Sequence, residues 1–324
     1  MRVEIFEVVQ PGLLTTVQDM GRYGYQQYGV PVSGAMDSFA LRVANLLLGN
    51  NEGEACLEIT LLGLRLRVLE DTVVAITGAD LSPMLNNSSL PMWEAVMVRH
   101  GDNISFPKPK RGCRSYLAVA DGIDVPRVMG SSSTYVKSHL GGLEGRPLRA
   151  GDRLKSGKAS PRILEGKLPS QYIPEYQNQS ELRVILGPQD DHFTEKGIHT
   201  FLHSEYTIST EADRVGYRLH GPCVEHKAGA DIISDGIPLG AVQVPGNGLP
   251  IVLLADRQTT GGYTKIATVI TVDIPKLAQA KPGDKVRFIQ ITEEEAHRAL
   301  KKYEQTIYTL KHWIQRGNSN GPAC

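Results

Sequence analysis

The chain has 324 residues, enough for two domains, and its 41% hydrophobic and 22% charged residues are typical of a globular protein. Its 35 lysines and arginines balance 35 aspartates and glutamates, so the charge gives no support for a nucleic acid or an anionic membrane as partner. We expect no transmembrane helix and no cleaved signal peptide, and the four widely spaced cysteines exclude a C-x-x-C zinc motif and favour the cytoplasm.

Short apolar runs, punctuated by 33 glycines and 19 prolines, predict a mainly β fold built as a barrel or a sandwich. A Gly-Asp pair precedes a predicted strand three times, at residues 101–104, 151–154 and 283–286. The last two pairs lie about 130 residues apart, which is weak support for two related β domains. Turns that recur in any β protein would explain the same pattern.

The first predicted helix covers residues 37–48. Asp37 can cap its N-terminus, and Gly49 can end it. Its residues are almost all apolar, so we expect the helix to be buried. Asn45 within it then needs a hydrogen-bond partner.

A polar, proline-containing stretch at residues 156–180 shows little periodicity and predicts a linker. The expected organisation is therefore a first β-barrel domain at 1–170, a second at 181–291 and a C-terminal helix at 292–317.

The most informative stretch joins predicted strands at residues 251–255 and 266–272. The ten residues between them exceed what a plain hairpin needs, and they include an acid, two cations, an amide, three threonines and a tyrosine. Two apolar strands would hold such a loop at the rim of a rigid sheet, where binding groups are commonly placed. A large solvated turn, with Gly261 and Gly262 supplying positive φ, explains the same residues.

The C-terminal helix begins with a capping box made by Thr292 and Glu295. One apolar stripe follows, and it either packs on the protein's own barrel or docks a partner. The stripe consists of Ala296, Leu300, Tyr303, Ile307, Leu310 and Ile314.

Several polar clusters accompany the loop, and each also has a plain structural explanation. Asp19 and Ser33 are candidate turn formers, and Asp213 with Arg214 is a candidate surface pair. Gln243 lies in an apolar run, where it either points into a barrel or satisfies backbone groups. Neutral side chains dominate these clusters, which favours a small ligand bearing an amide or a carboxylate.

An arginine, Arg214 or Arg257, would pair with a ligand carboxylate through its planar fork, and glutamines and threonines would hold an amide. The sequence contains no G-x-S-x-G, H-E-x-x-H or G-x-G-x-x-G motif and no biotin-attachment segment. His199 and His203 lack a further ligand nearby, so no metal site is expected.

Collinear motifs over roughly residues 3–300 carry a family resemblance. They lie at 15–22, 33–37, 142–148, 187–189, 213–219, 240–245 and 254–270, and the last is the most specific. The chain resembles the family of 5-oxoprolinase C subunits, also called the KipI antagonist or allophanate hydrolase subunit 2-like family. The chain departs from the family pattern at Val215, Asp121 and Ser132, and the last two lie on predicted loops, so they bear on substrate range more than on fold.

The resemblance implies two tandem cyclophilin-like β-barrels without prolyl isomerase function. It implies a complex with the A and B subunits of 5-oxoprolinase, the second of which is KipI-like, and this complex opens 5-oxoproline to glutamate with ATP. No metal held by this chain and no covalent biotin are expected. The alternatives are a regulator that binds a KipI-like histidine-kinase inhibitor and a carboxyltransferase-type module acting on urea or a related amide.

On this hypothesis the chain is inactive alone, and its scattered clusters converge in space. The predicted catalytic residues are Asp213, Arg214, Asp256 and Arg257. The two arginines would recognise an anion, and one of the two aspartates would orient an arginine or act as a base. The predicted substrate-binding residues are Gln18, Asp19, Ser33, Asn45, Gln243, Gln258, Thr259, Thr260, Tyr263 and Lys265.

Overall fold

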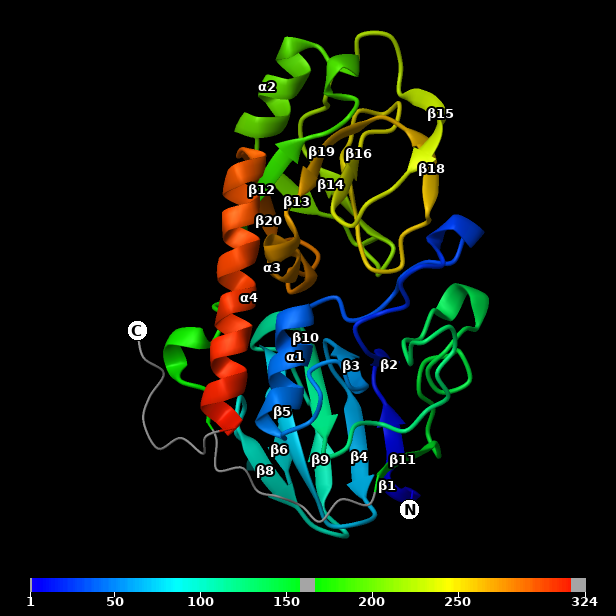
Figure 1. The fold of residues 1–324 in the computed structure, drawn as a ribbon, viewed down its shortest axis with the longest axis vertical. Helices are drawn as coiled ribbons and strands as arrows, with labels where there is room; N and C mark the ends of the chain where they lie inside the picture. Colours follow the sequence, from blue (N-terminus) through cyan, green and yellow to red (C-terminus); the bar gives the residue numbers. More distant parts are fainter. Residues whose placement is uncertain (1, 158–166, 316–324) are drawn as a thin grey trace. The chain divides into compact units, whose positions relative to one another are not determined.

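The computed structural model describes residues 2–157 and 167–315 and is mainly β, with a long C-terminal helix, as predicted (Figure 1). The chain divides into two compact units, and neither is continuous in sequence. The first unit takes residues 1–22, 33–176 and 304–324, and the second takes 23–32 and 177–303. The predicted domain boundaries stay a prediction, and residues 316 and 317 of the predicted helix lie outside the described residues.

Two sheets enclose the core of the first unit. One has the strand order β11-β1-β4-β9-β6-β7 and the other β2-β3-β10-β5-β8, so the described strands form two layers here and not one closed ring. Side chains such as Phe6, Leu66 and Leu117, one or more from each sheet, share a single hydrophobic cluster. The strands are β1 (Arg2–Pro11), β2 (Leu14–Gln18), β3 (Cys56–Thr60), β4 (Leu64–Val68), β5 (Thr72–Asp80), β6 (Met84–Leu85), β7 (Ser88–Ser89), β8 (Ala95–Val98), β9 (Asn103–Ser105), β10 (Arg111–Val119) and β11 (Arg153–Gly157).

The predicted first helix is confirmed as α1 (Ser38–Leu47), whose N-cap is Asp37. The Asp37 carboxylate accepts a hydrogen bond of 3.0 Å from the backbone N–H of Ala40. Gly49, just beyond the helix, has a φ of +71°, the left-handed conformation that ends helices. Short 3₁₀ turns in this unit are η2 (Val136–Ser138) and η3 (Ser170–Tyr172).

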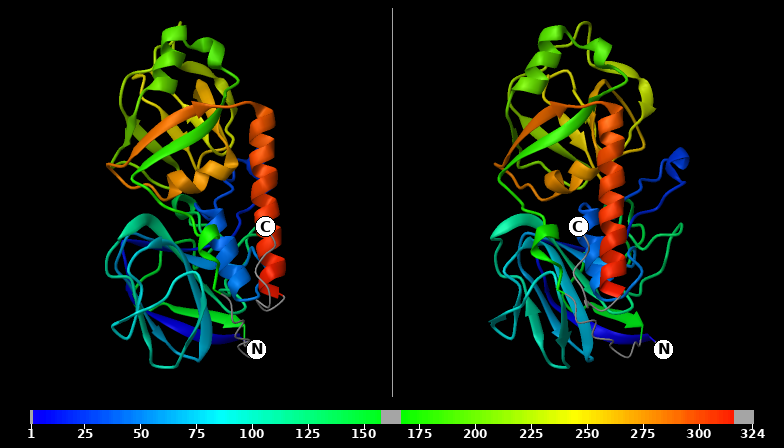
Figure 2. Two further views of the ribbon diagram at one scale, coloured as in Figure 1. Left: turned by 90° about the vertical axis from the view of Figure 1, so that its left-hand side faces the viewer. Right: turned by 60° about the vertical axis from the view of Figure 1, so that its left-hand side comes forward.

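The second unit is a closed seven-stranded barrel with the order β12-β19-β16-β17-β14-β13-β20 (Figure 2). A separate two-stranded ribbon pairs β15 with β18. The strands are β12 (Gln179–Leu186), β13 (Tyr206–Ile208), β14 (Gly216–His220), β15 (Asp231–Gly236), β16 (Ala241–Gln243), β17 (Ile251–Leu253), β18 (Thr260–Tyr263), β19 (Lys265–Val269) and β20 (Lys285–Gln290). The helices are η1 (Gln26–Tyr28), η4 (Asp190–His192), α2 (Glu195–His203), η5 (Thr271–Asp273) and α3 (Ile274–Ala278).

The predicted C-terminal helix is α4 (Glu293–Gln315), one unbroken helix (Figure 2). Its capping box is confirmed: Glu295 accepts from the N–H of Thr292 at 2.9 Å, and the Thr292 hydroxyl accepts from the N–H of Glu295 at 3.2 Å. The stripe is buried towards its C-terminal end, at Ile307, Leu310 and Ile314, whereas Leu300 is exposed. None of the described helices is long and apolar enough to cross a membrane.

The informative stretch differs from its prediction in three ways. The first strand ends at Leu253 and the last ends at Val269, because η5 follows. The segment expected as a loop contains a strand, β18, which pairs with residues 231–236 of β15. That partner is distant in sequence, so no local pattern around residues 260–263 could predict the pairing.

The three Gly-Asp turns form one repeated structure. Each glycine has a φ near +90°, namely +88°, +89° and +91° for Gly101, Gly151 and Gly283. Each aspartate carboxylate accepts from the backbone N–H three residues before it, at 2.8, 2.7 and 3.0 Å. The Gly-Asp pair thus holds a tight turn at the start of β9, β11 and β20.

Candidate functional site

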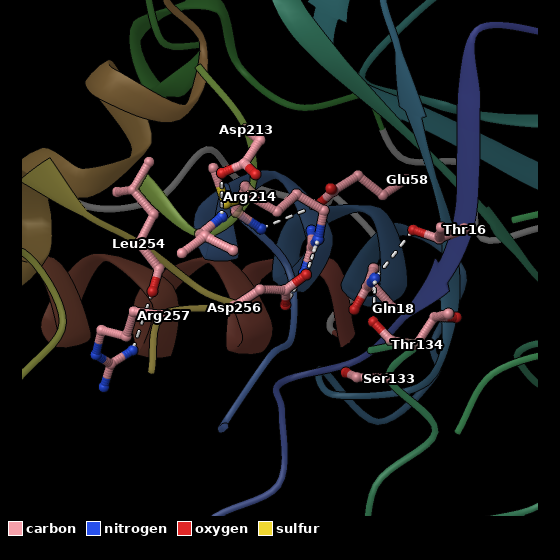
Figure 3. A network of polar contacts seen from close by, with 12 residues as sticks. Thr16, Gln18, Glu58, Ser133, Thr134, Asp213, Arg214, Leu254, Asp256 and Arg257 are labelled. Atoms are coloured by element: carbon pink, nitrogen blue, oxygen red, sulfur yellow. Dashed lines mark hydrogen bonds and ion pairs between the residues drawn. The ribbon is translucent and has the colours of Figure 1, made fainter. Parts of the chain in front are cut away.

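The residues that open the 256–265 segment are fixed by a buried ion pair in the second unit. The Arg214 fork faces the Asp256 carboxylate, with N–O distances of 2.9 and 3.0 Å (Figure 3). The two side chains are 5% and 7% exposed. The backbone N–H of Asp256 also donates to the carbonyl of Arg214, at 2.8 Å. This pair joins the turn before β14 to the turn after β17, so it is suited to positioning the segment that follows.

Arg257 has a different environment from Arg214, and Figure 3 shows it directed away from the Arg214–Asp256 pair. Its guanidinium donates to two backbone carbonyls, those of Ile237 at 3.0 Å and Leu254 at 3.2 Å. Within the described residues no carboxylate lies within ion-pair distance of it. Burial lowers the pKa of Arg257, against a small opposing contribution from Tyr23. The side chain is thus a cation held by neutral groups, with capacity for an anion.

Arg257 lines a cavity of about 300 Å³ in the second unit. Polar lining comes from Gln258 and Thr259, which follow Arg257, and from Gln26 of the 23–32 segment. The remaining wall is largely apolar and consists of Pro31, Val32, Gly236, Ile237 and Pro238. A small cavity with one cation, two amides and a hydroxyl fits a small anionic ligand that carries an amide.

Gln243 and Lys265 are buried near this cavity, with exposed fractions of 2% and 1%. They are directly paired residues of β16 and β19. Gly261 of β18 lies against Gln243, because a Cβ added to this glycine would be 2.8 Å from the Gln243 Nε2 atom and 3.6 Å from that of Gln258. A larger residue here would require the Ile237 and Gln243 side chains to shift.

The other predicted residues of the second unit are less enclosed. The Asp213 carboxylate accepts from the N–H groups of Val215 at 2.8 Å and Gly216 at 3.1 Å, a turn that explains the residue locally. Thr260 is exposed, and Tyr263 is 42% exposed. Neither lines the cavity.

Four predicted substrate-binding residues belong to the first unit. The Gln18 amide nitrogen donates to the Thr16 hydroxyl at 2.9 Å and to the Thr134 carbonyl at 3.1 Å (Figure 3). Its amide oxygen has no hydrogen-bond donor among the described residues. The hydroxyl of Ser33, at a φ of +56°, is likewise buried without a partner in the described part of the chain.

Asp19 and Asn45 are fully used by the fold. The Asp19 carboxylate accepts from the backbone of Gly21 and Ser132 and from the hydroxyls of Ser131 and Ser133, at 2.5 to 2.8 Å. The Asn45 amide donates to the Glu54 carbonyl at 2.8 Å, among others, and its oxygen accepts from Asn50 at 2.9 Å. The partner predicted for Asn45 is therefore present. Both residues organise loops, and we leave them out of the proposed ligand contacts.

Three neighbours of the site are not among the predicted site residues, although one of them, Gln189, lies in a motif of the family resemblance. Gln26 lies in a segment without periodicity, more than 200 positions before the loop it meets. Gln189 accepts from the backbone N–H of Lys265 at 3.2 Å. Asp235 lies 3.1 Å from the Lys265 ammonium. Asp235 is paired with Gly261 in the β15–β18 ribbon, so its approach to Lys265 depends on a strand pairing that no local pattern predicts.

The chain is similar to known proteins over nearly its whole length. Residues 28–290 match the family described as "Carboxyltransferase domain, subdomain A and B". The chain is 40% identical to the 5-oxoprolinase C subunit of Escherichia coli (strain K12), over 97% of this chain and 100% of that protein. Identity to the 5-oxoprolinase C subunit of Haemophilus influenzae is 35%, over 94% and 96%. The crystal structure of Kluyveromyces lactis urea carboxylase matches with a TM-score of 0.88 and 32% identity, over 95% of this chain and 29% of that longer one.

Proposed function

Because the chain belongs to the carboxyltransferase domain family, subdomains A and B, we propose that it is the C subunit of an ATP-dependent 5-oxoprolinase. The full-length similarity to two proteins that are named as C subunits of 5-oxoprolinase supports this assignment. The observation that carries it in the structure is Arg257, a cation without a carboxylate partner among the described residues, at a small cavity with amide and hydroxyl groups.

The proposed substrate, 5-oxoproline, is a five-membered lactam with one carboxylate. In this proposal the carboxylate pairs with Arg257, and the lactam amide meets Gln26, Gln258 and Thr259. A cavity of about 300 Å³ suits a molecule of this size. Asp256 and Arg214 hold the start of the segment in place and touch no substrate in this proposal.

A lactam carbon is a poor electrophile, which explains the need for ATP. Transfer of the γ-phosphoryl group of ATP to the lactam oxygen, with release of ADP, would make the carbonyl carbon of the ring electrophilic enough for water to attack it. In the net reaction the lactam, ATP and two waters give glutamate, ADP and phosphate. We propose that the chain performs its part in a complex with the A and B subunits of the enzyme, the second of which is KipI-like. In this proposal the chain is inactive alone, and the complex works in the cytoplasm.

A second function is carboxyl transfer to urea or a related amide. The family description and the 32% identity to a urea carboxylase favour it. Urea has no carboxylate, so Arg257 would have no anion to bind in urea itself. Loss of activity on addition of avidin, with urea as acceptor, would support this alternative. In a purely regulatory role the chain would only bind a KipI-like inhibitor, and this role does not explain the cavity that Arg257 lines.

The test is coexpression with candidate A and B subunits, followed by assay of ATP-dependent glutamate release from 5-oxoproline. We expect Arg257→Ala to raise the KM for 5-oxoproline about 10- to 100-fold, because a charge-assisted hydrogen bond to the carboxylate is lost. Arg257→Lys should recover part of this loss. The matched control is Arg218→Ala, an exposed arginine paired with Glu211 at 3.1 Å. An unchanged KM in Arg257→Ala, with the complex still assembled, contradicts the assignment.

A further inference from the structure

Two buried hydrogen-bond donors lie side by side in the wall of the barrel. Lys265 and Gln243 are paired residues of β19 and β16, so their side chains leave the sheet on one face. Within the described residues, the Gln243 amide nitrogen has no hydrogen-bond acceptor, and the Lys265 ammonium meets one carboxylate, that of the exposed Asp235, at 3.1 Å. Buried donors of this kind are costly unless an acceptor reaches them, so a ligand acceptor would complete them.

The β15–β18 ribbon brings two further residues to these donors. Asp235 and Gly261 are paired residues of the ribbon. The Asp235 carboxylate lies 3.1 Å from the Lys265 ammonium. Gly261 lies against the Gln243 amide, as described above. The four residues therefore form one cluster, in which the donors are deep and the single carboxylate comes from the ribbon.

The Asp235–Lys265 ion pair is unequal. The Lys265 side chain is 1% exposed, whereas the Asp235 side chain is 56% exposed. The Lys265 ammonium, with the N–H of Gly236, holds the pKa of Asp235 below its usual value, so this carboxylate is charged at neutral pH. Asp235 can turn into water and remain solvated, but Lys265 cannot. An entering anion can thus replace Asp235 as the partner of Lys265.

We propose that Lys265 and Gln243 form a donor site for a substrate oxygen that carries or gains negative charge, and that Asp235 occupies this site until the substrate arrives. The identity of the substrate rests on the proposed function. The oxygen is then either the lactam oxygen or a phosphoryl oxygen, since both present the same acceptor chemistry. Ile237 and Gln258 border Gly261 and also line the Arg257 cavity, so the donor site and the carboxylate site share these two neighbours.

Ligand binding to the purified chain tests directly whether an anion replaces Asp235 as the partner of Lys265. Inorganic phosphate, 5-oxoproline and proline are titrated by calorimetry into the wild type, Lys265→Met and Asp235→Asn. We expect Lys265→Met to weaken anion binding at least 10-fold and Asp235→Asn to tighten it about 3-fold or more, because the competing carboxylate is removed. Asp231→Asn, an exposed position on the same ribbon, is the matched control.

The probes separate the two sources of the oxygen. A Lys265 effect on 5-oxoproline but not on proline, which lacks the lactam oxygen, identifies the acyl oxygen; an effect on phosphate alone identifies a phosphoryl oxygen. The proposal is overturned if the wild type binds neither phosphate nor 5-oxoproline, if Lys265→Met binds both unchanged, or if Asp235→Asn fails to tighten binding.

Stability and turnover give a second, independent readout. Lys265→Met removes a buried ammonium whose carboxylate partner, Asp235, is exposed and stays solvated, and Gln243→Met removes a buried amide without an acceptor in the described part of the chain, so Tm should stay the same or rise. In the assembled complex kcat should fall about 100-fold with little change in KM, opposite to Arg257→Ala. A clear fall in Tm would instead indicate a structural role. A wild-type complex that leaves 5-oxoproline intact refutes the proposed function, while the phosphate titrations still decide the donor site.

Discussion

At the scale of single residues, side chains of the same type have different roles at different positions because their partners differ. Arg214 shares two short hydrogen bonds with Asp256, whereas Arg257 donates to backbone carbonyls and faces a cavity. Asp19 is saturated by four donors, whereas Asp235 is half-exposed beside one buried lysine. Residue type alone therefore predicted a site near these positions but not which members are available to a ligand.

Asp273 gives a pH prediction at this scale. Burial acts to raise the pKa of its carboxyl, but hydrogen bonds from Arg183 at 2.7 and 2.9 Å and the ammonium of Lys276 outweigh burial and lower it. A lowered folded-state pKa stabilises the protein above the unfolded pKa of about 4, and this stability is lost as the pH falls through the folded value. We expect Asp273→Asn to lower the free energy of unfolding at pH 7 by about 1.5 to 3 kcal/mol, because hydrogen bonds to a charged carboxylate are lost, and to flatten its acid dependence.

Urea unfolding at pH 7 and pH 3 checks this expectation. The control is Asp191→Asn, whose side chain is 77% exposed and which should change stability by no more than about 0.5 kcal/mol. An Asp273→Asn variant that keeps the wild-type acid slope would show that the Arg183 pairing contributes nothing to the pH dependence.

At the scale of elements, the Gly-Asp turns show how a short pattern can fix where a strand begins. A Cβ at Gly101, Gly151 or Gly283 would meet no atom within 4 Å, so an alanine there costs only its left-handed backbone conformation. We expect each glycine-to-alanine variant to lose about 1 to 2 kcal/mol of stability, with similar values at the three sites. Urea denaturation of the three single variants measures this.

The control for these variants is Gly246→Ala. Gly246 also has open space around it, but its φ is not positive, so the Gly246→Ala variant should change the free energy of unfolding by close to zero. If the three turn variants were as stable as Gly246→Ala, the positive φ would not be the reason for glycine at these positions.

At the scale of the whole molecule, α4 belongs to both units: residues 293–303 count with the second and the rest of the helix with the first. Ile307, Leu310 and Ile314 are buried, and Glu304 makes two bonds to Arg42, at 2.7 and 2.8 Å. Truncation after Tyr303 removes these groups from the first unit. We expect a loss of about 5 kcal/mol, because each buried aliphatic side chain contributes about 1.5 to 3 kcal/mol.

Thermal unfolding followed by circular dichroism tests the truncation. A chain ending at Gln315 keeps every described contact and serves as the control. A Tm equal to that of the control would mean that the C-terminal half of α4 packs without stabilising the first unit.

The sequence by itself determined the β class, the ends of α1, the start of α4 and the three Gly-Asp turns. These features depend on hydrogen bonds and backbone conformations within a few residues, such as the contact of Asp37 with Ala40. Tertiary structure alone decided that residues 260–263 form a strand, that Gln26 reaches the Arg257 cavity, and that Asp235 meets Lys265. Those contacts join positions distant along the chain, and burial and pairing arise only when the sheets close around them.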